Sequence, residues 1–401
     1  MALHPRGELY AMGPERAREY GFVSYYNHTG NETLDRLTNN ITLTTEEWLQ
    51  LVTSPVQFIL KSGGWGGLGI DATVLSQLFP CLLWTIVFAG LRFFAQKQLS
   101  RLGLWLQVVV PRHGDKNNMT TSQRLKLKKF QNQLWLTVYY TASTIFGYVI
   151  LRDKPWFGLP VSESNRIALL TPHPYKPEVE LLRYYRYGLG FYIAEMAALV
   201  VEIDIKRSDF FEYFIHHVVT LLLIIISHCS YEHRFGVYVL FIHDASDILL
   251  ALGKVINYVV KGDGNRMRNR KAGKSKNAAA NAPVSRLYKA IFNDSMLTAC
   301  FLMFTVLFFF FRLLCLPFLA LANIVYGVKI RMFTWSFTFL IFLLQVALQG
   351  LHVYWFTLIL KIIASTITGK SVEDIRSEDD DDDDDGGGGE ALPKKSKRKE
   401  K

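Results

Sequence analysis

Seven long apolar segments constrain the fold of this chain more than any other feature of its sequence. The hydrocarbon core of a bilayer is about 30 Å thick, so roughly 20 apolar helical residues are needed to cross it. Segments of this kind occupy residues 72–95, 134–151, 187–205, 210–229, 235–260, 296–316 and 334–364. We therefore predict an all-α polytopic membrane helix bundle with about seven transmembrane spans.

The charged residues between these segments predict the orientation of the bundle. Residues 96–133 contain eight Lys or Arg against a single acid, Asp115, and residues 261–289 are also basic. Cytosolic loops of membrane proteins carry such an excess of Lys and Arg. With seven spans, both loops and the C-terminus face the cytosol and the N-terminus is lumenal. This distribution accounts for the net charge of +10 without a nucleic-acid partner.

Residues 1–71 are predicted to form a lumenal N-terminal tail, and residues 72–133 the first span with its basic cytosolic loop. The tail contains glycosylation sequons at Asn27, Asn31 and Asn40, which would be modified only on the lumenal side. Chance sequons are the alternative reading. Within the second basic loop, residues 262–284 are rich in Gly, Asn and Ala without apolar periodicity, so they are predicted to be a flexible insertion.

Residues 365–401 are predicted to be a disordered cytosolic tail, because an Asp run is followed by four glycines and a basic end. Ser371 and Ser377 each precede an acid by three residues and are candidate phosphorylation sites; a solvating tail is the alternative. Lys397 and Lys399 resemble a dilysine retrieval signal of endoplasmic-reticulum membrane proteins. A plain basic tail is the alternative there.

Ionisable side chains inside two neighbouring spans mark the candidate site, because such groups are costly in a membrane and usually functional. Residues at spacings of three or four, which share a helix face, are Asp209, Glu212, His216 and Thr220 in one span and His243, Asp247 and Lys254 in the next, with Ser246 beside them. A short turn near residues 230–234 makes the spans antiparallel. At about 1.5 Å per residue, the His216–His217 pair and Asp247 both lie roughly 22 Å from that turn. We therefore predict that imidazoles and carboxylates meet in the cytosolic half of the bundle.

Polar residues in other spans have alternative interpretations. Glu195 and Glu202 are seven residues apart and are candidates to line the same cavity, although Glu202 fits an interfacial position better. Gln345, Gln349 and His352 form a stripe that either faces the cavity or hydrogen-bonds between helices. Arg312 is expected to extend to the lumenal interface.

The cluster has three possible interpretations: a metal site, an acyl-transfer site or a structural polar network. Di-iron membrane enzymes require many histidines in HxxxH or HxxHH spacing, which is absent here, so no metal is expected. A neutral imidazole beside a carboxylate suits acyl transfer, as a base for an amine or as a nucleophile toward an activated acyl group. A purely structural polar network is the remaining alternative.

At these residues the sequence resembles the ceramide synthases, the acyl-transferring branch of the TLC-domain proteins. Their longevity-assurance motif is a His-His pair followed by a Thr, an Arg-x-Gly, a His-Asp-x-Ser-Asp and a Lys. The matching residues are His216, His217, Thr220, Arg234, Gly236, His243, Asp244, Ser246, Asp247 and Lys254. The resemblance implies that residues 134–364 form a TLC catalytic domain.

The resemblance implies an acyl-CoA-dependent N-acyltransferase of the endoplasmic-reticulum membrane that condenses a fatty acyl-CoA with a sphingoid base to give ceramide or dihydroceramide. Acyl-CoA is then a co-substrate, and no further cofactor is expected. The implied catalytic residues are His216, His217, His243, Asp244 and Asp247. The candidate substrate-binding residues are Thr220, Arg234, Ser246, Lys254, Lys206, Arg207, Gln349 and His352.

The expected partners are therefore acyl-CoA, a sphingoid base and membrane lipid, and not nucleic acid. A homodimer, a heterodimer or an accessory subunit is compatible with the sequence. Two alternative functions stay open: a non-catalytic TLC-domain protein, translocon-associated or lipid-sensing, and an acyltransferase for another lipid.

Overall fold

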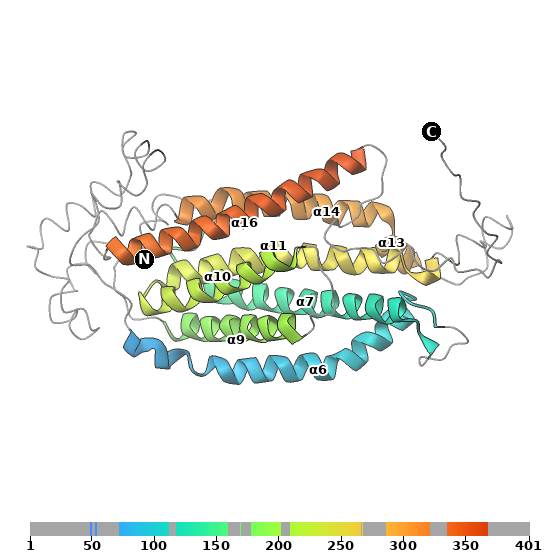
Figure 1. The fold of residues 1–401 in the computed structure, drawn as a ribbon, viewed down its shortest axis with the longest axis horizontal. Coiled ribbons are helices and arrows are strands. Elements are labelled where there is room, and N and C mark those ends of the chain that lie inside the picture. The colour runs from blue at the N-terminus through green and yellow to red at the C-terminus, as the bar shows by residue number, and fades with distance from the viewer. Residues whose placement is uncertain are drawn as a thin grey trace, which may run out of the picture.

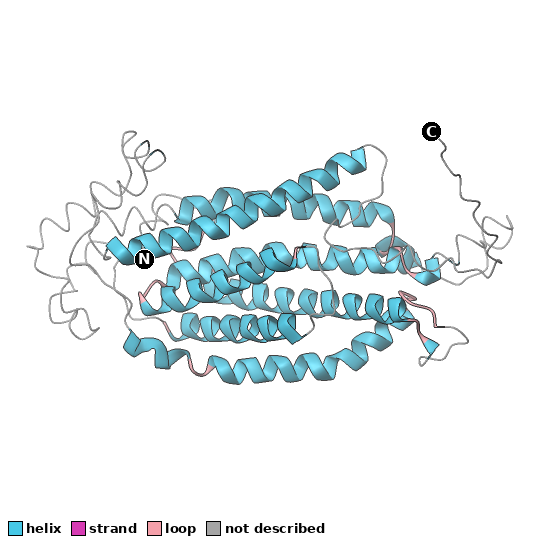
Figure 2. Cartoon of the chain, viewed as in Figure 1, coloured by secondary structure: helices cyan, strands magenta, loops and turns pink. Residues whose placement is uncertain are grey.

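Every regular element in the described part of the chain is a helix (Figure 2). The computed structural model describes residues 72–111, 118–158, 178–201, 209–265, 286–320 and 335–367, together with Leu49, Thr53, Leu169 and Met267. The helices are η1 (Ala72–Leu78), α6 (Cys81–Trp105), α7 (Thr121–Leu151), α9 (Val179–Val201), α10 (Phe210–Cys229), α11 (His233–Val260), α13 (Arg286–Ile291), α14 (Asp294–Phe308), η5 (Phe309–Cys315) and α16 (Trp335–Ile367). The expected all-α bundle is confirmed.

Six described helical stretches are long and apolar enough to cross a membrane, so the chain is a multi-pass membrane protein. They are Leu75–Trp105, Thr121–Leu151, Phe210–Cys229, His233–Asn265, Asp294–Ala320 and Phe339–Ser365. The remaining predicted span coincides with α9, whose 23 residues are about 34 Å long but include several charged side chains. Figure 1 shows α9 running alongside the other long helices, between α6 and α7 in this view. The count of seven spans stays a prediction.

The outer surface of α6 is apolar. Leu83, Ile86, Phe93 and Phe94 are all exposed. A water-soluble protein rarely exposes so many large apolar side chains side by side, whereas a lipid-facing surface requires them. This face of α6 therefore agrees with a helix that borders the bilayer.

Two helices extend further than the sequence analysis expected. The predicted basic loop, residues 96–133, is largely helical, because α6 continues to Trp105 and α7 begins at Thr121. Thr120 starts α7 with a capping box: its hydroxyl accepts from the backbone N–H of Gln123, whose side chain accepts from the backbone N–H of Thr120. The apolar segments marked only the membrane-crossing part of each helix, so the connecting loop is shorter than predicted.

A carboxylate fastens the helix ends on the predicted cytosolic side. Asp263 accepts hydrogen bonds from the backbone N–H of Val110 at 3.1 Å and from the side chain of Gln123 at 3.0 Å, and lies 3.6 Å from the ammonium of Lys126. Residues 262–265 were predicted to begin a flexible insertion, and this part of that prediction is wrong. They pack against the ends of α6 and α7.

A tight turn between α10 and α11 sets the depth of the candidate site. Tyr231 has a left-handed backbone, with φ of 61°. Its N–H donates to the carbonyl of His228 at 3.1 Å, and the N–H of Glu232 donates to the carbonyl of Ser227 at 2.8 Å. This is the Schellman pattern that ends a helix and reverses the chain. The predicted antiparallel hairpin is confirmed.

A buried ion pair attaches α9 to α6. Arg92 donates from Nη1 to both carboxylate oxygens of Glu195, at 2.8 and 2.9 Å. The indole N–H of Trp135 on α7 donates to the same carboxylate at 3.0 Å. Glu195 therefore joins three helices, and the suggestion that it lines the candidate cavity is wrong.

Candidate active site

A cavity lies between α7, α9, α10, α11, α16 and the helix formed by α14 and η5. Apolar side chains line much of it, including Leu223, Ile224, Phe235, Ile341 and Leu348. Pockets for small molecules are typically lined in this way, with a few polar groups that fix the ligand. The apolar lining suits a long hydrocarbon chain.

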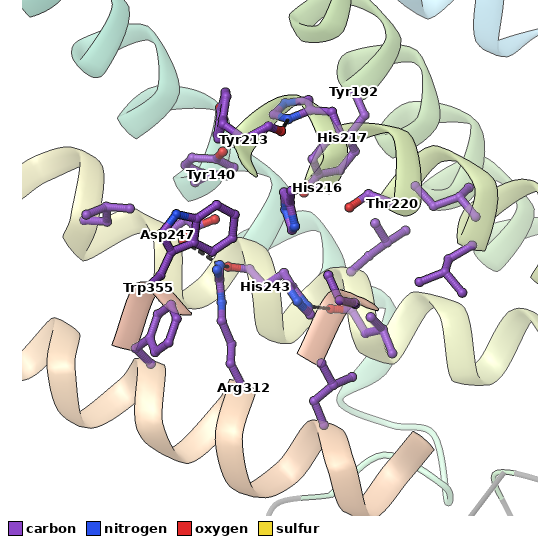
Figure 3. A pocket seen from close by; sticks show the side chains of 18 of the residues that line it. Tyr140, Tyr192, Tyr213, His216, His217, Thr220, His243, Asp247, Arg312 and Trp355 are labelled. Carbon is purple, nitrogen blue, oxygen red and sulfur yellow. Dashed lines mark hydrogen bonds and ion pairs between the residues drawn. The ribbon is translucent and has the colours of Figure 1, made fainter. Parts of the chain in front are cut away.

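Four imidazoles gather at this cavity. His216 and His217 come from α10, His243 from α11, and all three line the cavity, whereas His352 of α16 is completely buried beside them. The ring centroids of His216 and His352 are 6.2 Å apart, and those of His243 and His352 are 5.1 Å apart. Figure 3 shows His216 and His243 facing the same space as Asp247. The structure thus brings together the histidines that the sequence singled out.

Backbone carbonyls fix the orientation of two of these rings. His217 Nδ1 lies 2.9 Å from the carbonyl oxygen of Tyr213, and His243 Nδ1 lies 2.7 Å from that of Val239. A carbonyl can only accept, so each Nδ1 carries a proton and each neutral ring has its lone pair at Nε2. His216 differs, because its Nδ1 has no hydrogen-bond partner among the described residues. His217 is therefore the adjacent histidine whose ring is fixed by a hydrogen bond.

His352 completes the arrangement behind His243. The two Nε2 atoms are 3.3 Å apart. Because His243 presents a lone pair there, neutral His352 must donate from its own Nε2. Of the polar stripe predicted on the last span, His352 contacts His243 and Gln345 lines the cavity. Gln349 does not line the cavity.

Asp247 forms an ion pair that the sequence analysis missed. Its Oδ1 lies 2.6 Å from Nη2 of Arg312, and the exposed fractions of the two side chains are 16% and 4%. Arg312 also donates from Nε to the hydroxyl of Ser246 at 3.2 Å and from Nη2 to the carbonyl of His243 at 3.3 Å. The expectation that Arg312 extends to the lumenal interface is therefore wrong. It points into the bundle.

Arg312 lies in an irregular helical segment. Residues Phe309–Cys315 form the π-helix η5, inserted between α14 and the residues that continue the helix to Ala320. The guanidinium carbon of Arg312 lies 5.0 Å from the centroid of the Phe308 ring, one turn earlier. Single π-turns in α-helices occur frequently at functional sites, since they redirect side chains.

Asp244 binds two hydroxyl groups away from the cavity. Its Oδ2 accepts from Ser143 of α7 at 2.6 Å and its Oδ1 accepts from Tyr192 of α9 at 2.7 Å. Within the described residues, neither Asp244 nor Asp247 hydrogen-bonds to an imidazole. One ties three helices together, and the other holds Arg312.

The candidate substrate-binding residues divide into three groups. Thr220 and Lys254 line the cavity, whereas Ser246 is fully buried behind Arg312. Arg234 lies in the first turn of α11, after the hairpin, and is not in the cavity lining. The remaining predicted positions fall outside the described residues; they are Lys206, Arg207, Asn27, Asn31, Asn40, Ser371 and Ser377.

Tyrosines and a tryptophan are among the lining residues that were not predicted as site residues. Tyr140, Tyr192, Tyr213 and Trp355 all border the cavity, and the Trp355 ring centroid is 5.2 Å from that of His216. Trp355 also donates from its indole to Asp209 at 3.3 Å. Aromatic residues are common throughout the apolar spans, so nothing in their spacing distinguished these four.

No three His, Cys, Asp or Glu side chains in the described part of the chain are grouped so as to hold a metal ion. The four cysteines, Cys81, Cys229, Cys300 and Cys315, are buried as free thiols. The polar groups at the cavity are imidazoles, phenols, amides, hydroxyls, the Lys254 ammonium, the Glu232 carboxylate and the Asp247–Arg312 pair.

Comparison with known families decides the affiliation of the chain. The family model described as the TLC domain matches residues 129–361, more than half of the chain and all of the cavity. This protein belongs to the TLC-domain family. The resemblance noted in the sequence is thereby confirmed.

Named relatives are ceramide synthases from animals and plants. Mouse ceramide synthase 3 is 31% identical over 256 residues, which are 63% of this chain and 56% of the relative. Mouse ceramide synthase 4 is 32% identical over 255 residues, 63% of this chain and 54% of the relative. The Arabidopsis thaliana protein named ceramide synthase 1 LOH3 is 26% identical over 311 residues, 74% of this chain and 88% of the relative. The chain thus spans just over half the length of the mouse relatives that it matches.

Proposed function

We propose that this TLC-domain protein is a ceramide synthase that transfers the acyl group of a fatty acyl-CoA to the amine of a sphingoid base, giving ceramide or dihydroceramide. The observation that carries the proposal is a cluster of imidazoles at the wall of a large, mainly apolar intramembrane cavity, in a chain whose relatives are named ceramide synthases. We place it in the endoplasmic-reticulum membrane, with a lumenal N-terminus and a cytosolic C-terminus.

The two ends of the reaction fit different parts of the cavity. The apolar side chains between α10, α11 and α16, among them Leu223, Leu240 and Leu348, accommodate the acyl chain. The imidazoles lie where the thioester carbonyl would be held. Lys254 and the basic residues of the predicted cytosolic loops suit the phosphates of CoA. Acyl-CoA serves as co-substrate, and we propose no other cofactor.

The imidazoles supply the proton chemistry. A sphingoid amine is largely protonated at neutral pH and must lose a proton before it attacks a carbonyl. His217, with its proton held on Nδ1 by the carbonyl of Tyr213, offers Nε2 as the base. His216 lies between His217 and Trp355, with ring centroids 5.9 and 5.2 Å away, and we assign it the attack on the thioester. The acyl-imidazole then passes its acyl group to the amine.

Product analysis tests the proposed activity directly. Membranes containing the protein are supplied with a sphingoid base and acyl-CoAs of varied length, and lipids are identified by mass spectrometry. Wild-type protein is expected to form N-acylated sphingoid base, and His217→Ala is expected to form none. His228→Gln, which changes a buried histidine outside the cavity lining, should retain activity per folded protein. Acylation of a different lipid, or no acyl transfer at all, would overturn the proposal.

A burst experiment tests the covalent step. Purified protein is mixed with acyl-CoA in the absence of amine, and free CoA thiol is measured. If His216 attacks the thioester, close to one equivalent of CoA appears and mass spectrometry finds an acyl adduct on the α10 peptide, and His216→Ala abolishes both. A preparation that makes ceramide without any burst or adduct would show that the amine attacks the thioester directly.

A further inference from the structure

The guanidinium of Arg312 is held on one side and open on the other. Nε donates to Ser246, and Nη2 donates to Asp247 and to the backbone carbonyl of His243. Nη1 makes no hydrogen bond with any residue that the structure describes, yet it is not enclosed by protein, because Arg312 lines the cavity. Figure 3 shows the side chain rising between Trp355 and His243, with its head against Asp247. Two N–H donors of one fixed cation are therefore free to meet a ligand.

Burial makes this placement expensive. A charged side chain within a membrane span is rare unless it is paired or functional, and Arg312 is only 4% exposed. Asp247 offsets the charge, but a buried ion pair is seldom more stabilising than apolar side chains of similar volume. The chain also interrupts a regular α-helix with η5 in the segment that carries this residue. Stability alone does not account for the charge, the helix irregularity and the open donors together.

We propose that Arg312 is a catalytic residue of the acyl transfer, whose Nη1 donates hydrogen bonds to the carbonyl oxygen of the acyl thioester. The proposal rests on the acyltransferase function proposed above. As a nitrogen nucleophile bonds to the carbonyl carbon, the C=O electron pair moves to oxygen, and Arg312 stabilises that oxyanion. When the pair returns, the C–S bond breaks and CoA leaves as a thiolate, which takes up the proton that the newly acylated nitrogen group gives up.

The anchored head of Arg312 is what this role requires. Donors stabilise a developing charge best when they are already fixed in place and shielded from water, because nothing must reorganise as the charge appears. Ser246, Asp247 and the carbonyl of His243 supply three such anchors on α11. His243 therefore contacts both parts of the site: its ring belongs to the imidazole cluster, and its backbone carbonyl accepts from the guanidinium. The oxyanion would lie next to the nucleophile.

Two variants and two acyl-CoA analogues test the assignment. Arg312→Gln removes the cation, whereas Arg312→Lys keeps a charge that can pair with Asp247 but lacks the planar donor fork. Both are expected to lower kcat for CoA release by about 10²- to 10³-fold, as for loss of one oxyanion donor. Affinity for a non-reactive thioether analogue should stay within about threefold, whereas a trifluoromethyl ketone analogue, which forms a tetrahedral oxyanion, should bind about 100-fold more weakly.

The control is Arg92→Gln, a buried arginine paired with Glu195 outside the cavity lining. It should leave both analogue affinities and the turnover of folded protein unchanged. The assignment is overturned if Arg312→Lys or Arg312→Gln retains near-normal turnover, or if both analogues lose affinity equally, which indicates a general binding or packing role. The two analogue affinities are measured without a sphingoid base. They therefore judge Arg312 even if the lipid product proves not to be ceramide.

Discussion

Two carboxylates of α11, Asp244 and Asp247, have partners on other helices. Asp247 pairs with Arg312, and Asp244 accepts from Ser143 and Tyr192. An unpaired charge inside a membrane protein is costly, so such pairings decide which helix faces can meet. The carboxylates of α11 therefore affect the site by fixing other side chains: Asp247 fixes Arg312, and Asp244 fixes Ser143 and Tyr192.

The variant Asp247→Asn tests whether Asp247 holds Arg312 in place. The variant keeps the shape of the side chain but leaves Arg312 without its counter-charge, so the guanidinium is expected to move from its anchored position. We expect turnover to fall by about 100-fold or more, since misplacement by about 1 Å costs on that scale. Acyl transfer per folded protein, measured in detergent, is the readout. Asp263→Asn, a carboxylate at the helix ends outside the cavity, is the matched control and should retain activity.

The sequence predicted the histidine cluster because helix geometry is regular. Counting residues from the hairpin turn placed His216, His217 and Asp247 at one depth, and all three line the cavity. The sequence did not predict which side chains form ion pairs or hydrogen bonds with one another. The partner of Asp247 is 65 residues away along the chain, on a different helix, and no periodicity within α11 reveals it. Pairing across helices depends on their rotation, which a single sequence does not specify.

The π-helix η5 controls where Arg312 points. A regular α-helix places successive side chains about 100° apart, and one extra residue in a π-turn shifts that phase. Pro317 follows closely and cannot donate a backbone hydrogen bond, so the sequence did carry a sign of irregularity near this point. Hydropathy alone predicted an uninterrupted span. That is why Arg312 was assigned to the interface.

Deletion of Phe310 should convert η5 to a regular α-helix. The helix itself is expected to persist, because every residue of η5 except Arg312 is apolar, but Arg312 should lose its contact with Asp247. We expect at least a tenfold loss of acyl transfer, by the same positional argument, with protein abundance retained. Helicity is followed by circular dichroism. Full activity would contradict a role for the π-turn, and deletion of Lys274, in the predicted flexible insertion, serves as the control.

The helix α9 is held by polar contacts of Glu195 as well as by its buried apolar and aromatic side chains, such as Leu181, Leu189 and Phe191. Arg92→Leu should remove the counter-charge of the buried Glu195 carboxylate, at a cost of about 3–5 kcal/mol in the free energy of unfolding. The double variant Arg92→Leu/Glu195→Leu should recover most of that loss, since two apolar side chains replace the pair. Thermal unfolding in detergent measures both. A double variant no more stable than Arg92→Leu would contradict this account of how α9 is held.

Polar contacts join helix ends at both ends of the bundle. Near one end, Asp263 joins the ends of α6, α7 and α11. At the other, Lys154 after α7 pairs with Glu178 before α9, and the Tyr238 hydroxyl donates to the carbonyl of Gly158 at 2.8 Å. These contacts agree with helices that alternate in direction, as expected for spans joined by short loops. The sequence predicted this architecture well, because the limits of most helices follow the apolar segments.

The orientation of the bundle in the membrane is the remaining prediction at this scale. Seven alternating helices, with α9 as the third span, put the N- and C-termini on opposite sides, and the basic loops assign the cytosol to the C-terminal side. Protease added to sealed microsomes should therefore remove a C-terminal tag and leave an N-terminal tag protected. Removal of N-glycans should increase the mobility of the wild type but not of an Asn27→Gln/Asn31→Gln/Asn40→Gln variant. A protected C-terminal tag would contradict seven spans. Cleavage of both tags would indicate six spans, with α9 outside the bilayer. The four charged side chains of α9 would account for that result; they are Glu180, Arg183, Arg186 and Glu195.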